Sequence, residues 1–342
     1  MTASHARGTD SDLPPEMRAF LRELGLGGGI EAARPLTGGV SSDIWLVQAG
    51  DQLVCIKRAL PALRVAADWR APVERSTYEY AWMTRVRGIA PDAVPPLLGR
   101  SADGAMFAMG YLDPADHPVW KDALLAGDVD VRFAGDVGAA LATIHSATTK
   151  DASIPTEFAS DHIFHAIRLE PYLLATARRH ADIAPQLLSL AQRTATTKRA
   201  LVHGDVSPKN ILLGRAGPIF LDAECAWHGD PAFDVAFCLN HLLLKCIALP
   251  RSVDDLLQAF FAFVSRYMAT VDWEDVRKIE QRCVTLLPAL TLARIDGKSP
   301  VDYISTEEDK QRVREIARAL IVEPRASLGE LAEAWRVAIA QP

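Results

Sequence analysis

The segment spanning residues 200–236 constrains the possible folds more than any other part of the chain. It opens with an apolar run that ends on His-Gly-Asp at 203–205, and an amide, Asn210, follows soon after. Two further apolar runs flank a Gly-Pro turn, and the second run ends on Asp-Ala-Glu at 222–224. Apolar runs on either side of a short glycine turn predict a β-hairpin. We therefore expect a hairpin with acidic and amide side chains at its strand ends.

These strand ends bring oxygen-bearing side chains toward one point. The four are Asp205, Asn210, Asp222 and Glu224. Carboxylate and amide oxygens suit Mg²⁺, which keeps several waters and is usually completed by substrate phosphates. The sequence therefore predicts a magnesium site held by Asn210 and Asp222, with Glu224 as a further or water-mediated ligand.

The spacing of this segment resembles the catalytic and metal-binding loops of the protein-kinase-like fold. His-Gly-Asp, where protein kinases carry His-Arg-Asp, is similar to the aminoglycoside phosphotransferase and choline kinase superfamily of small-molecule kinases. Asp-Ala-Glu at 222–224 resembles the Asp-x-Glu of 5-methylthioribose kinases, and the runs at 74–79 and 120–127 resemble segments of the same kinases. The resemblance implies an α+β, two-lobed fold. Its small N-lobe has an antiparallel sheet and a helix, and its larger, mainly helical C-lobe carries the catalytic hairpin.

Length and composition agree with two lobes. The chain has 342 residues, of which 49% are hydrophobic, and this is enough apolar material for a sizeable core in each lobe. We expect a flexible tail at 1–13, an N-lobe that binds the nucleotide at 14–111, and a C-lobe with the catalytic, metal and acceptor sites at 112–342.

The resemblance assigns the nucleotide site to a glycine turn and a lysine. The turn contains Gly38, Gly39, Val40 and Ser41. A turn of this kind lets backbone N–H groups approach phosphate oxygens closely. The strand at 52–57 ends on Lys57, at the position where the kinase fold has the lysine that holds the α- and β-phosphates.

A helix after this strand supplies the partner of the lysine. Glu79 shares a helical stripe with Met83 and Val86, which favours Glu79 as the ion-pair partner of Lys57; Glu74 is the alternative. The hinge between the lobes is expected at Met109 to Tyr111, where backbone groups pair with the adenine edge. ATP and Mg²⁺ are the implied cofactors, and the choice between ATP and GTP stays open.

The catalytic loop is expected to act through Asp205, which orients a substrate hydroxyl and accepts its proton. His203 and Asn210 complete the loop, and Asp234 is expected to brace it from below. Lys209 has two open roles: it neutralises the γ-phosphate, or it is simply solvated.

The acceptor is a small molecule with a hydroxyl group, and its binding residues are the least defined. The candidates are Trp227, His228, Asp230, Arg294 and Lys298. The motifs favour a methylthioribose-like sugar, but Ala293 stands where methylthioribose kinases carry the first of two arginines. Aminoglycoside, homoserine and choline or ethanolamine kinases are the alternatives. The helices after residue 236 are not notably acidic, which favours a neutral or anionic acceptor.

Two other classes of protein, a phosphoesterase and a silent nucleotide-binding protein, account for the sequence less well. A metal-dependent phosphoesterase would need several metal-binding His and Asp groups on successive strand ends, and it would leave the Lys57 strand unexplained. A catalytically silent nucleotide-binding protein would not need the full set of catalytic groups that this chain carries.

The charge and cysteine content exclude further classes. A net charge of -6 and a pI of about 5.9 do not favour nucleic acid or an anionic membrane as partner. No uninterrupted apolar run approaches the roughly 18 residues of a membrane helix, and the polar start of the chain lacks the apolar core of a signal peptide. Five dispersed cysteines predict reduced thiols in a cytoplasmic protein. A homodimer is left open.

Overall fold

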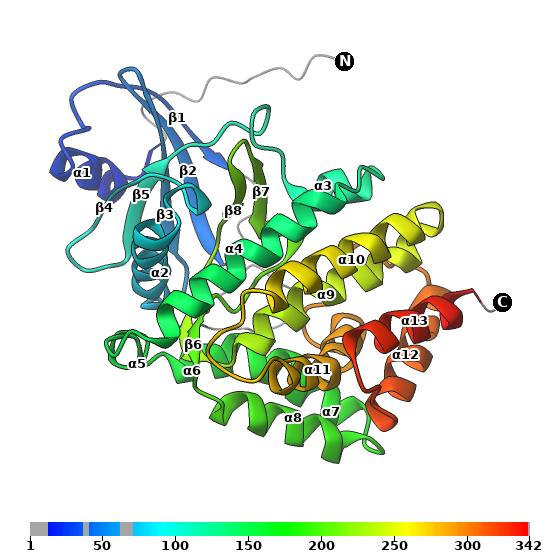
Figure 1. Cartoon of the computed structure of the whole chain (residues 1–342). Helices are drawn as coiled ribbons and strands as arrows, with labels where there is room; N and C mark the ends of the chain where they lie inside the picture. Colours follow the sequence, from blue (N-terminus) through cyan, green and yellow to red (C-terminus); the bar gives the residue numbers. More distant parts are fainter. Residues whose placement is uncertain (1–12, 37–40, 62–70, 341–342) are drawn as a thin grey trace.

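The computed structural model describes residues 13–36, 41–61 and 71–340. Two lobes lie side by side: one is built around a five-stranded sheet, and the other is mainly helical (Figure 1). The predicted α+β, two-lobed, kinase-like architecture is confirmed. The tail expected at 1–13 lies outside the described residues except for Leu13, whose side chain is buried against the first helix.

The N-lobe sheet is antiparallel throughout, with strand order β1-β2-β3-β5-β4. The strands are β1 (Ile30–Leu36), β2 (Ser42–Ala49), β3 (Gln52–Ala59), β4 (Leu97–Arg100) and β5 (Met106–Gly110). Side chains alternate between the two faces of a strand. Val54 and Ile56 of β3 therefore pack with α1 (Pro15–Glu23), while Lys57 faces α2 (Arg75–Ile89). The strand predicted to carry the lysine is β3.

The C-lobe is organised around α9, whose side chains are almost all buried. Helices α4 and α10 pack on each other, α11 packs on α9, and the last two helices close one end of the lobe (Figure 1). The helices are α3 (Trp120–Leu125), α4 (Val131–Thr149), α5 (Ile154–Glu157), α6 (Asp161–Phe164), α7 (Ala175–Arg179), α8 (Ala184–Thr196), α9 (Pro231–Ala248), α10 (Val253–Met268), α11 (Val276–Asp296), α12 (Glu307–Val322) and α13 (Leu328–Ile339).

Two C-lobe segments depart from a regular helix. Between α6 and α7 lies a π-helical segment, His165–Leu174, which contains Pro171. Proline cannot donate the regular helical hydrogen bond, and π-helical turns are frequent at functional sites. Helix α11 continues to Asp296 through Pro288, and every residue from Leu286 to Asp296 is buried.

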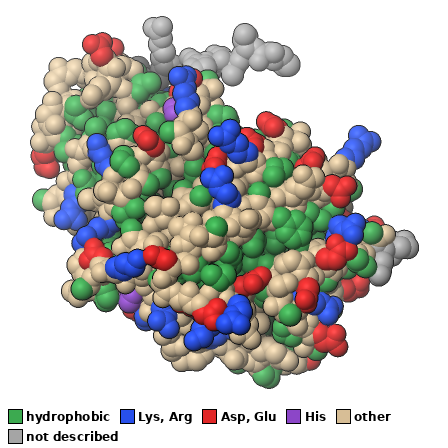
Figure 2. All heavy atoms as spheres, in the orientation of Figure 1, with side chains coloured by type: hydrophobic (Ala, Val, Ile, Leu, Met, Phe, Trp, Pro, Cys, Tyr) green, Lys and Arg blue, Asp and Glu red, His purple; other side chains and the backbone are tan. Residues whose placement is uncertain are grey.

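By length and composition α9 could cross a membrane, with 18 residues of mean hydropathy 1.3. However, 94% of that window is buried inside the protein, as in the core helix of a globular lobe. On the face shown in Figure 2, Lys and Arg side chains are interspersed with Asp and Glu side chains.

Two small sheets position the catalytic segment. Strand β6 (Ala200–Val202) pairs with β9 (Trp227–Gly229), and β7 (Ile211–Gly214) pairs with β8 (Gly217–Phe220). The second pair is the predicted hairpin. Residues 203–210 and 221–226 are the connections at the ends of these strands, so they lie together where the hairpin meets β3 and α2 of the N-lobe.

Candidate active site

The first turn of α9 holds the catalytic loop in place. The carboxylate of Asp234 accepts hydrogen bonds from the backbone N–H groups of His203 (2.7 Å) and Gly204 (2.8 Å). Asp234 is fully buried, and its second interaction, with His145, is 3.3 Å long. Asp234 therefore braces the loop from below, as the sequence predicted.

Gly204 has a backbone conformation and surroundings that other residues would not tolerate. Its φ is +80°, and a Cβ built on it would lie 2.7 Å from Cβ of Cys225 and 2.8 Å from the Cys225 carbonyl oxygen. L-residues avoid this region of φ, whereas glycine adopts it readily. The packing thus explains why the loop reads His-Gly-Asp.

Asp205 lies buried between two cations. Its Oδ2 is 2.8 Å from Nη2 of Arg168 and 3.2 Å from Nζ of Lys209. Burial by itself would raise the pKa of Asp205, but the charges of Arg168 and Lys209 outweigh burial and hold the pKa below its ordinary value. Asp205 is therefore a carboxylate at neutral pH, able to accept a hydrogen bond from a hydroxyl group.

His203 connects the loop to the hairpin. Its Nδ1 accepts a hydrogen bond from the Asp205 backbone N–H (3.1 Å), so its Nε2–H is assigned as the donor to the Leu221 carbonyl oxygen (3.1 Å). Burial lowers the pKa of His203, and the Trp82 ring packs edge-on against the imidazole at 4.7 Å between centroids. These contacts make His203 a neutral positioning residue for Asp205.

Lys57 joins the two lobes. Its Nζ lies 2.7 Å from Oε1 of Glu79 and also forms an ion pair with Asp222. Burial would lower the pKa of Lys57, but the two carboxylates raise it above its ordinary value, so Lys57 is an ammonium. The alternative partner, Glu74, instead lies 2.6 Å from Nε2 of His162. The structure therefore pairs Lys57 with Glu79.

Asp222 has an unusual backbone. Its φ of +66° is the only positive φ of a non-glycine residue in the described ranges. Aspartate is among the few residues that tolerate this region, and such conformations cluster at functional sites. Burial would raise the pKa of Asp222, but the charges of Lys57 and Lys209 lower it. The second of these, Lys209, has its Nζ 3.9 Å from Oδ2 of Asp222.

Asn210 lies next to Asp222 because the Leu221 N–H donates to the Asn210 carbonyl oxygen (2.9 Å). The Asn210 amide nitrogen donates to the Asp205 carbonyl oxygen (3.2 Å), so its side-chain oxygen remains available to a ligand such as a metal ion. One carboxylate and one amide oxygen fit Mg²⁺, whose other ligands are usually waters and substrate phosphates. Over 13–36, 41–61 and 71–340 there is no group of three or more His, Cys, Asp or Glu side chains that could hold a metal by itself.

Glu224, predicted as a further or water-mediated metal ligand, contacts Arg75 in the structure, and its metal role stays a prediction. Its Oε2 accepts a hydrogen bond from Nε of Arg75 (2.8 Å). Arg75 is fully buried and donates to four backbone carbonyl groups as well. Those carbonyl groups belong to Ser41, Leu60, Ala71 and Pro72. Arg75 thus connects the segment that follows β8 to the end of the glycine turn. Glu224 is the residue of that segment that accepts its hydrogen bond.

Comparisons with known proteins agree with this geometry. A family model described as "Phosphotransferase enzyme family" (APH) matches residues 32–273, more than half of the chain. The chain belongs to this family. The methylthioribose kinase of Escherichia coli O45:K1 (strain S88 / ExPEC) is 25% identical over 238 residues, covering 60% of this chain and 56% of that protein. Methylthioribose kinase 1 of Oryza sativa subsp. japonica is 22% identical over 249 residues, covering 64% of this chain and 58% of that protein.

The chain therefore spans less than two thirds of the length of these curated relatives. Among solved structures, "Amicoumacin kinase hAmiN in complex with AMP-PNP, Ca2+ and Ami" aligns with a TM-score of 0.56 and 12% identity, covering 92% of this chain and 96% of that chain. At this identity the likeness concerns the fold alone. The predicted resemblance to the aminoglycoside phosphotransferase and choline kinase superfamily is confirmed.

Several predicted nucleotide-site residues of this phosphotransferase-family chain lie near the junction of the lobes. Met109 is in β5, between Cys55 of β3 and Leu97 of β4, and the Tyr111 N–H donates to the Leu53 carbonyl oxygen (3.0 Å). Ser41 is buried and its carbonyl oxygen bonds to Arg75. Gly38, Gly39 and Val40 lie outside the described residues. Contact of these residues with a nucleotide stays a prediction.

Three of the predicted acceptor residues have contacts that lead away from Asp205. Trp227 is buried and stacks on Phe164, with 4.0 Å between ring centroids. His228 is half-buried on β9, where the charges of Lys198 and Asp161 act on it. Asp230 caps α9 by accepting from the Ala232 N–H (3.0 Å), and it also bonds to Arg282. These contacts favour structural roles, and the assignment of the three residues to the acceptor site stays a prediction.

The other two acceptor candidates lie beside the π-helical segment. Arg294 is buried and its Nη1 donates to the Tyr172 hydroxyl (3.1 Å). Tyr172 shares the π-helical segment with Arg168, the partner of Asp205. Lys298 forms an ion pair with Glu170 (2.8 Å). Arg294 is therefore linked through Tyr172 to the segment that carries Arg168, and Lys298 is engaged with an acid.

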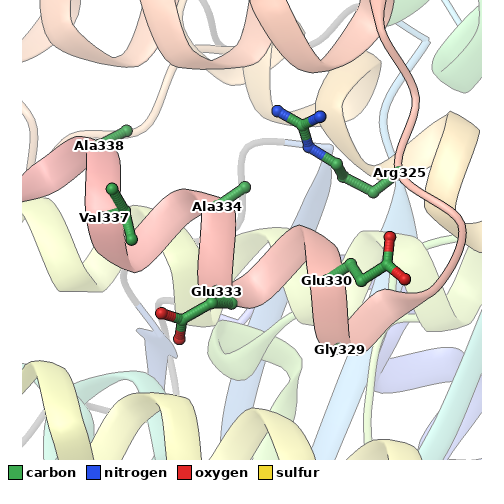
Figure 3. Close-up of a pocket in the computed structure, with 7 residues that line it drawn as sticks. All are labelled: Arg325, Gly329, Glu330, Glu333, Ala334, Val337 and Ala338. Carbon is green, nitrogen blue, oxygen red and sulfur yellow. The ribbon is translucent and has the colours of Figure 1, made fainter.

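Arg168, Tyr172 and Arg75 are site residues for which the sequence analysis assigned no role. Neither Arg168 nor Tyr172 belongs to a motif, and Arg75 appeared only within the run at 74–79. A surface hollow along α13, from Gly329 to Ala338 with Arg325 beside it, shares no residue with the site (Figure 3).

Proposed function

We propose that the chain is an ATP- and Mg²⁺-dependent phosphotransferase that phosphorylates a hydroxyl group of a small molecule, with Asp205 as catalytic base. The observation that carries this proposal is the meeting of charged groups from both lobes. Lys57 and Glu79 come from the N-lobe, whereas Asp222 and Asp205 come from the two ends of the catalytic segment. Phosphoryl transfer needs positioning and charge neutralisation more than covalent chemistry, and this arrangement supplies both.

Asp205 would accept the hydrogen bond of the acceptor hydroxyl, orient its oxygen toward the γ-phosphate and take the proton late in the reaction. The carboxylate is fixed by Arg168 and by the backbone contacts of its loop. Lys209 lies 3.2 Å from Asp205 and 3.9 Å from Asp222, between the proton acceptor and the metal carboxylate. This location favours its role in neutralising the transferred phosphoryl group over simple solvation.

Asn210 and Asp222 would hold Mg²⁺, and Lys57 together with the glycine turn would bind the phosphates of ATP. When bound, the metal would neutralise charge on the phosphates. The amicoumacin kinase of the same fold is described in complex with AMP-PNP and Ca²⁺, which supports a nucleotide and a divalent cation in this cleft.

A methylthioribose-like sugar is the favoured acceptor, because the curated relatives are methylthioribose kinases at about 25% identity. The single arginine at Arg294, after Ala293, departs from the arginine pair expected of those kinases and keeps aminoglycosides, homoserine, choline and ethanolamine as alternatives. All five cysteines are buried and free of disulfides, which supports a reducing, cytoplasmic location.

The test is Mg²⁺-dependent ADP release from ATP across a panel of hydroxyl acceptors: methylthioribose and other pentoses, homoserine, choline, ethanolamine and aminoglycosides. We expect one class to respond in the wild type and to fall silent in Asp205→Ala. ATP binding without turnover across the panel would instead favour a silent nucleotide-binding protein of the same fold.

A further inference from the structure

Beyond Asp234, the buried face of α9 carries two side chains with titratable nitrogen atoms. His241 and Lys245 follow Asp234 by seven and eleven residues, so all three share one helical stripe. Lys245 is fully buried, and its Nζ has no hydrogen-bond partner among the described residues. The ring of Tyr303 has its centroid 4.5 Å from Nζ. A buried amine or ammonium group without a hydrogen-bond partner is costly.

Two neighbouring side chains also have a buried nitrogen without a partner in the described part of the chain. Nε2 of His241 has none, although its Nδ1 lies 3.1 Å from the Tyr303 hydroxyl. Nε of Arg294 has none, although its Nη1 reaches the Tyr172 hydroxyl and Ser299. Buried polar groups are nearly always hydrogen-bonded, so three unpartnered nitrogen atoms in one place indicate a missing acceptor.

The charges around this group are mostly positive. Burial lowers the pKa of His241, and the charges of Arg294, Lys245, Lys209 and Lys121 lower it further. The carboxylate of Asp302, whose charge acts on Lys245, is already paired with Lys121 at 2.7 Å. Within residues 13–36, 41–61 and 71–340, no carboxylate forms an ion pair with Lys245, His241 or Arg294. The missing acceptor should therefore be an anion.

A chain of contacts links this cationic group to the catalytic carboxylate. Arg168 bonds to Asp205, and its guanidinium lies over the ring of Tyr172 at 5.8 Å. The Tyr172 hydroxyl then accepts from Arg294. Lys209, which contacts Asp205, also acts on His241 through its charge. A single small molecule could thus place a hydroxyl at Asp205 and an acidic group among the cations.

We propose that Lys245, His241 and Arg294 form an anion subsite that binds a carboxylate or phosphate group of the hydroxyl acceptor. This inference rests on the proposed kinase function and narrows its substrate class to acidic acceptors. Carboxylate and phosphate both accept charge-assisted hydrogen bonds from ammonium and guanidinium groups. Tyr303, on the segment between α11 and α12, covers Lys245 and is half-buried, so it lies between the subsite and solvent.

The test uses matched probes that differ only in the acidic group: glycerol, glycerate and glycerol 3-phosphate, and ribose, ribonate and ribose 5-phosphate. Thermal unfolding of the full chain with Mg²⁺ and AMP-PNP reports binding, and Mg²⁺-dependent ADP release from ATP reports turnover. AMP-PNP occupies the phosphate site at Lys57, so any stabilisation by the acidic probes must come from binding at a different site. The carboxylate and phosphate members of each set distinguish the two kinds of anion.

The informative variant is Lys245→Met, which keeps the length of the side chain and removes the charge. We expect acidic probes to raise the Tm of the wild type above the uncharged probe, and their apparent affinity to fall on the order of 10- to 100-fold in the variant, as for loss of a hydrogen bond to a charged group. Lys150→Met removes an exposed lysine paired with Asp272 and should leave the response intact. His241→Gln should weaken it as well.

The outcomes separate the two proposals. An equal response to charged and uncharged probes, or a response that Lys245→Met leaves unchanged, would overturn the anion subsite. Turnover of an uncharged acceptor without any response to acids would also overturn it while supporting the kinase. Acid binding that depends on Lys245 without ADP release would support the subsite and count against the kinase proposal.

Discussion

Two clusters of buried charge, one at the junction of the lobes and one inside the C-lobe, differ in how their charges are compensated. In the catalytic cluster, Asp205 is paired with Arg168 and Lys209, and Asp222 is paired with Lys57. In the anion subsite, Lys245 meets only the ring of Tyr303. Burying a charge with a hydrogen-bonded partner is tolerated, whereas burying it without one is strongly destabilising. The first cluster is therefore preorganised before any ligand binds, whereas we expect the second to be completed by its ligand.

The largest expected effect tests the catalytic cluster. Asp205→Ala should lower kcat by a factor on the order of 10² to 10⁴, the usual range for a general base. Asp222→Ala should be at least as damaging, because it removes a metal ligand and also leaves Lys57 without one of its two carboxylates. Steady-state ADP release at saturating Mg²⁺ measures both variants. Unchanged turnover in Asp222→Ala would contradict the metal assignment.

The next prediction concerns the pH dependence of the free energy of unfolding, which tests the burial of Lys245 in the anion subsite. Burial, with the charge of Lys121, lowers the pKa of Lys245 from 10.5 to about 7. Between these two values the unfolded chain binds more protons than the folded chain, so the free energy of unfolding should rise as pH increases from about 7 toward 10.5. The contribution should be a few kcal/mol in the wild type.

Denaturant unfolding of the wild type and Lys245→Met across this pH range checks the prediction. The variant should be more stable than the wild type near pH 7, and the difference should shrink toward pH 10. Lys150→Met is the matched control, since its lysine is exposed. Parallel pH curves for the wild type and Lys245→Met would contradict the lowered pKa and show that the charge of Lys245 has a stabilising partner.

A smaller effect on catalysis should distinguish Glu79, which lies in α2, from Glu74, which precedes the helix. Glu79→Gln removes the partner that lies 2.7 Å from Lys57, and kcat/KM for ATP should fall about 10- to 100-fold, as for a lost hydrogen bond between charged groups. Glu74→Gln is the control, because Glu74 is exposed and contacts His162. Equal losses in the two variants would remove the special role of Glu79.

The smallest effect concerns the geometry of the catalytic loop. Gly204→Ala should lower the free energy of unfolding by about 1 to 3 kcal/mol, because its Cβ would overlap Cys225 at a positive φ. Gly88→Ala in α2 is a matched control: a Cβ there meets no atom within 4 Å, and helix propensity predicts stabilisation by about 0.5 to 1 kcal/mol. Urea unfolding of both variants measures the difference, and a stable Gly204→Ala protein would contradict the packing argument.

The sequence by itself determined the parts of this protein that depend on local spacing. The hairpin of β7 and β8, the glycine in the catalytic loop and the strand that carries Lys57 were all predictable. Turn residues and alternating apolar runs act over a few neighbours, so their effects can be read without knowing the rest of the fold. The family followed from the same short motifs.

Only the tertiary structure decided which distant side chains meet these motifs. It chose Glu79 over Glu74, turned Glu224 toward Arg75, and placed Trp227 in the core. It also brought Arg168 to Asp205 across 37 positions of the chain. Such contacts depend on how helices pack rather than on spacing, and no local pattern in the sequence marks them. The unpartnered amine of Lys245 belongs to this second class, because the packing of α9 buries it and no acid among the described residues forms an ion pair with it.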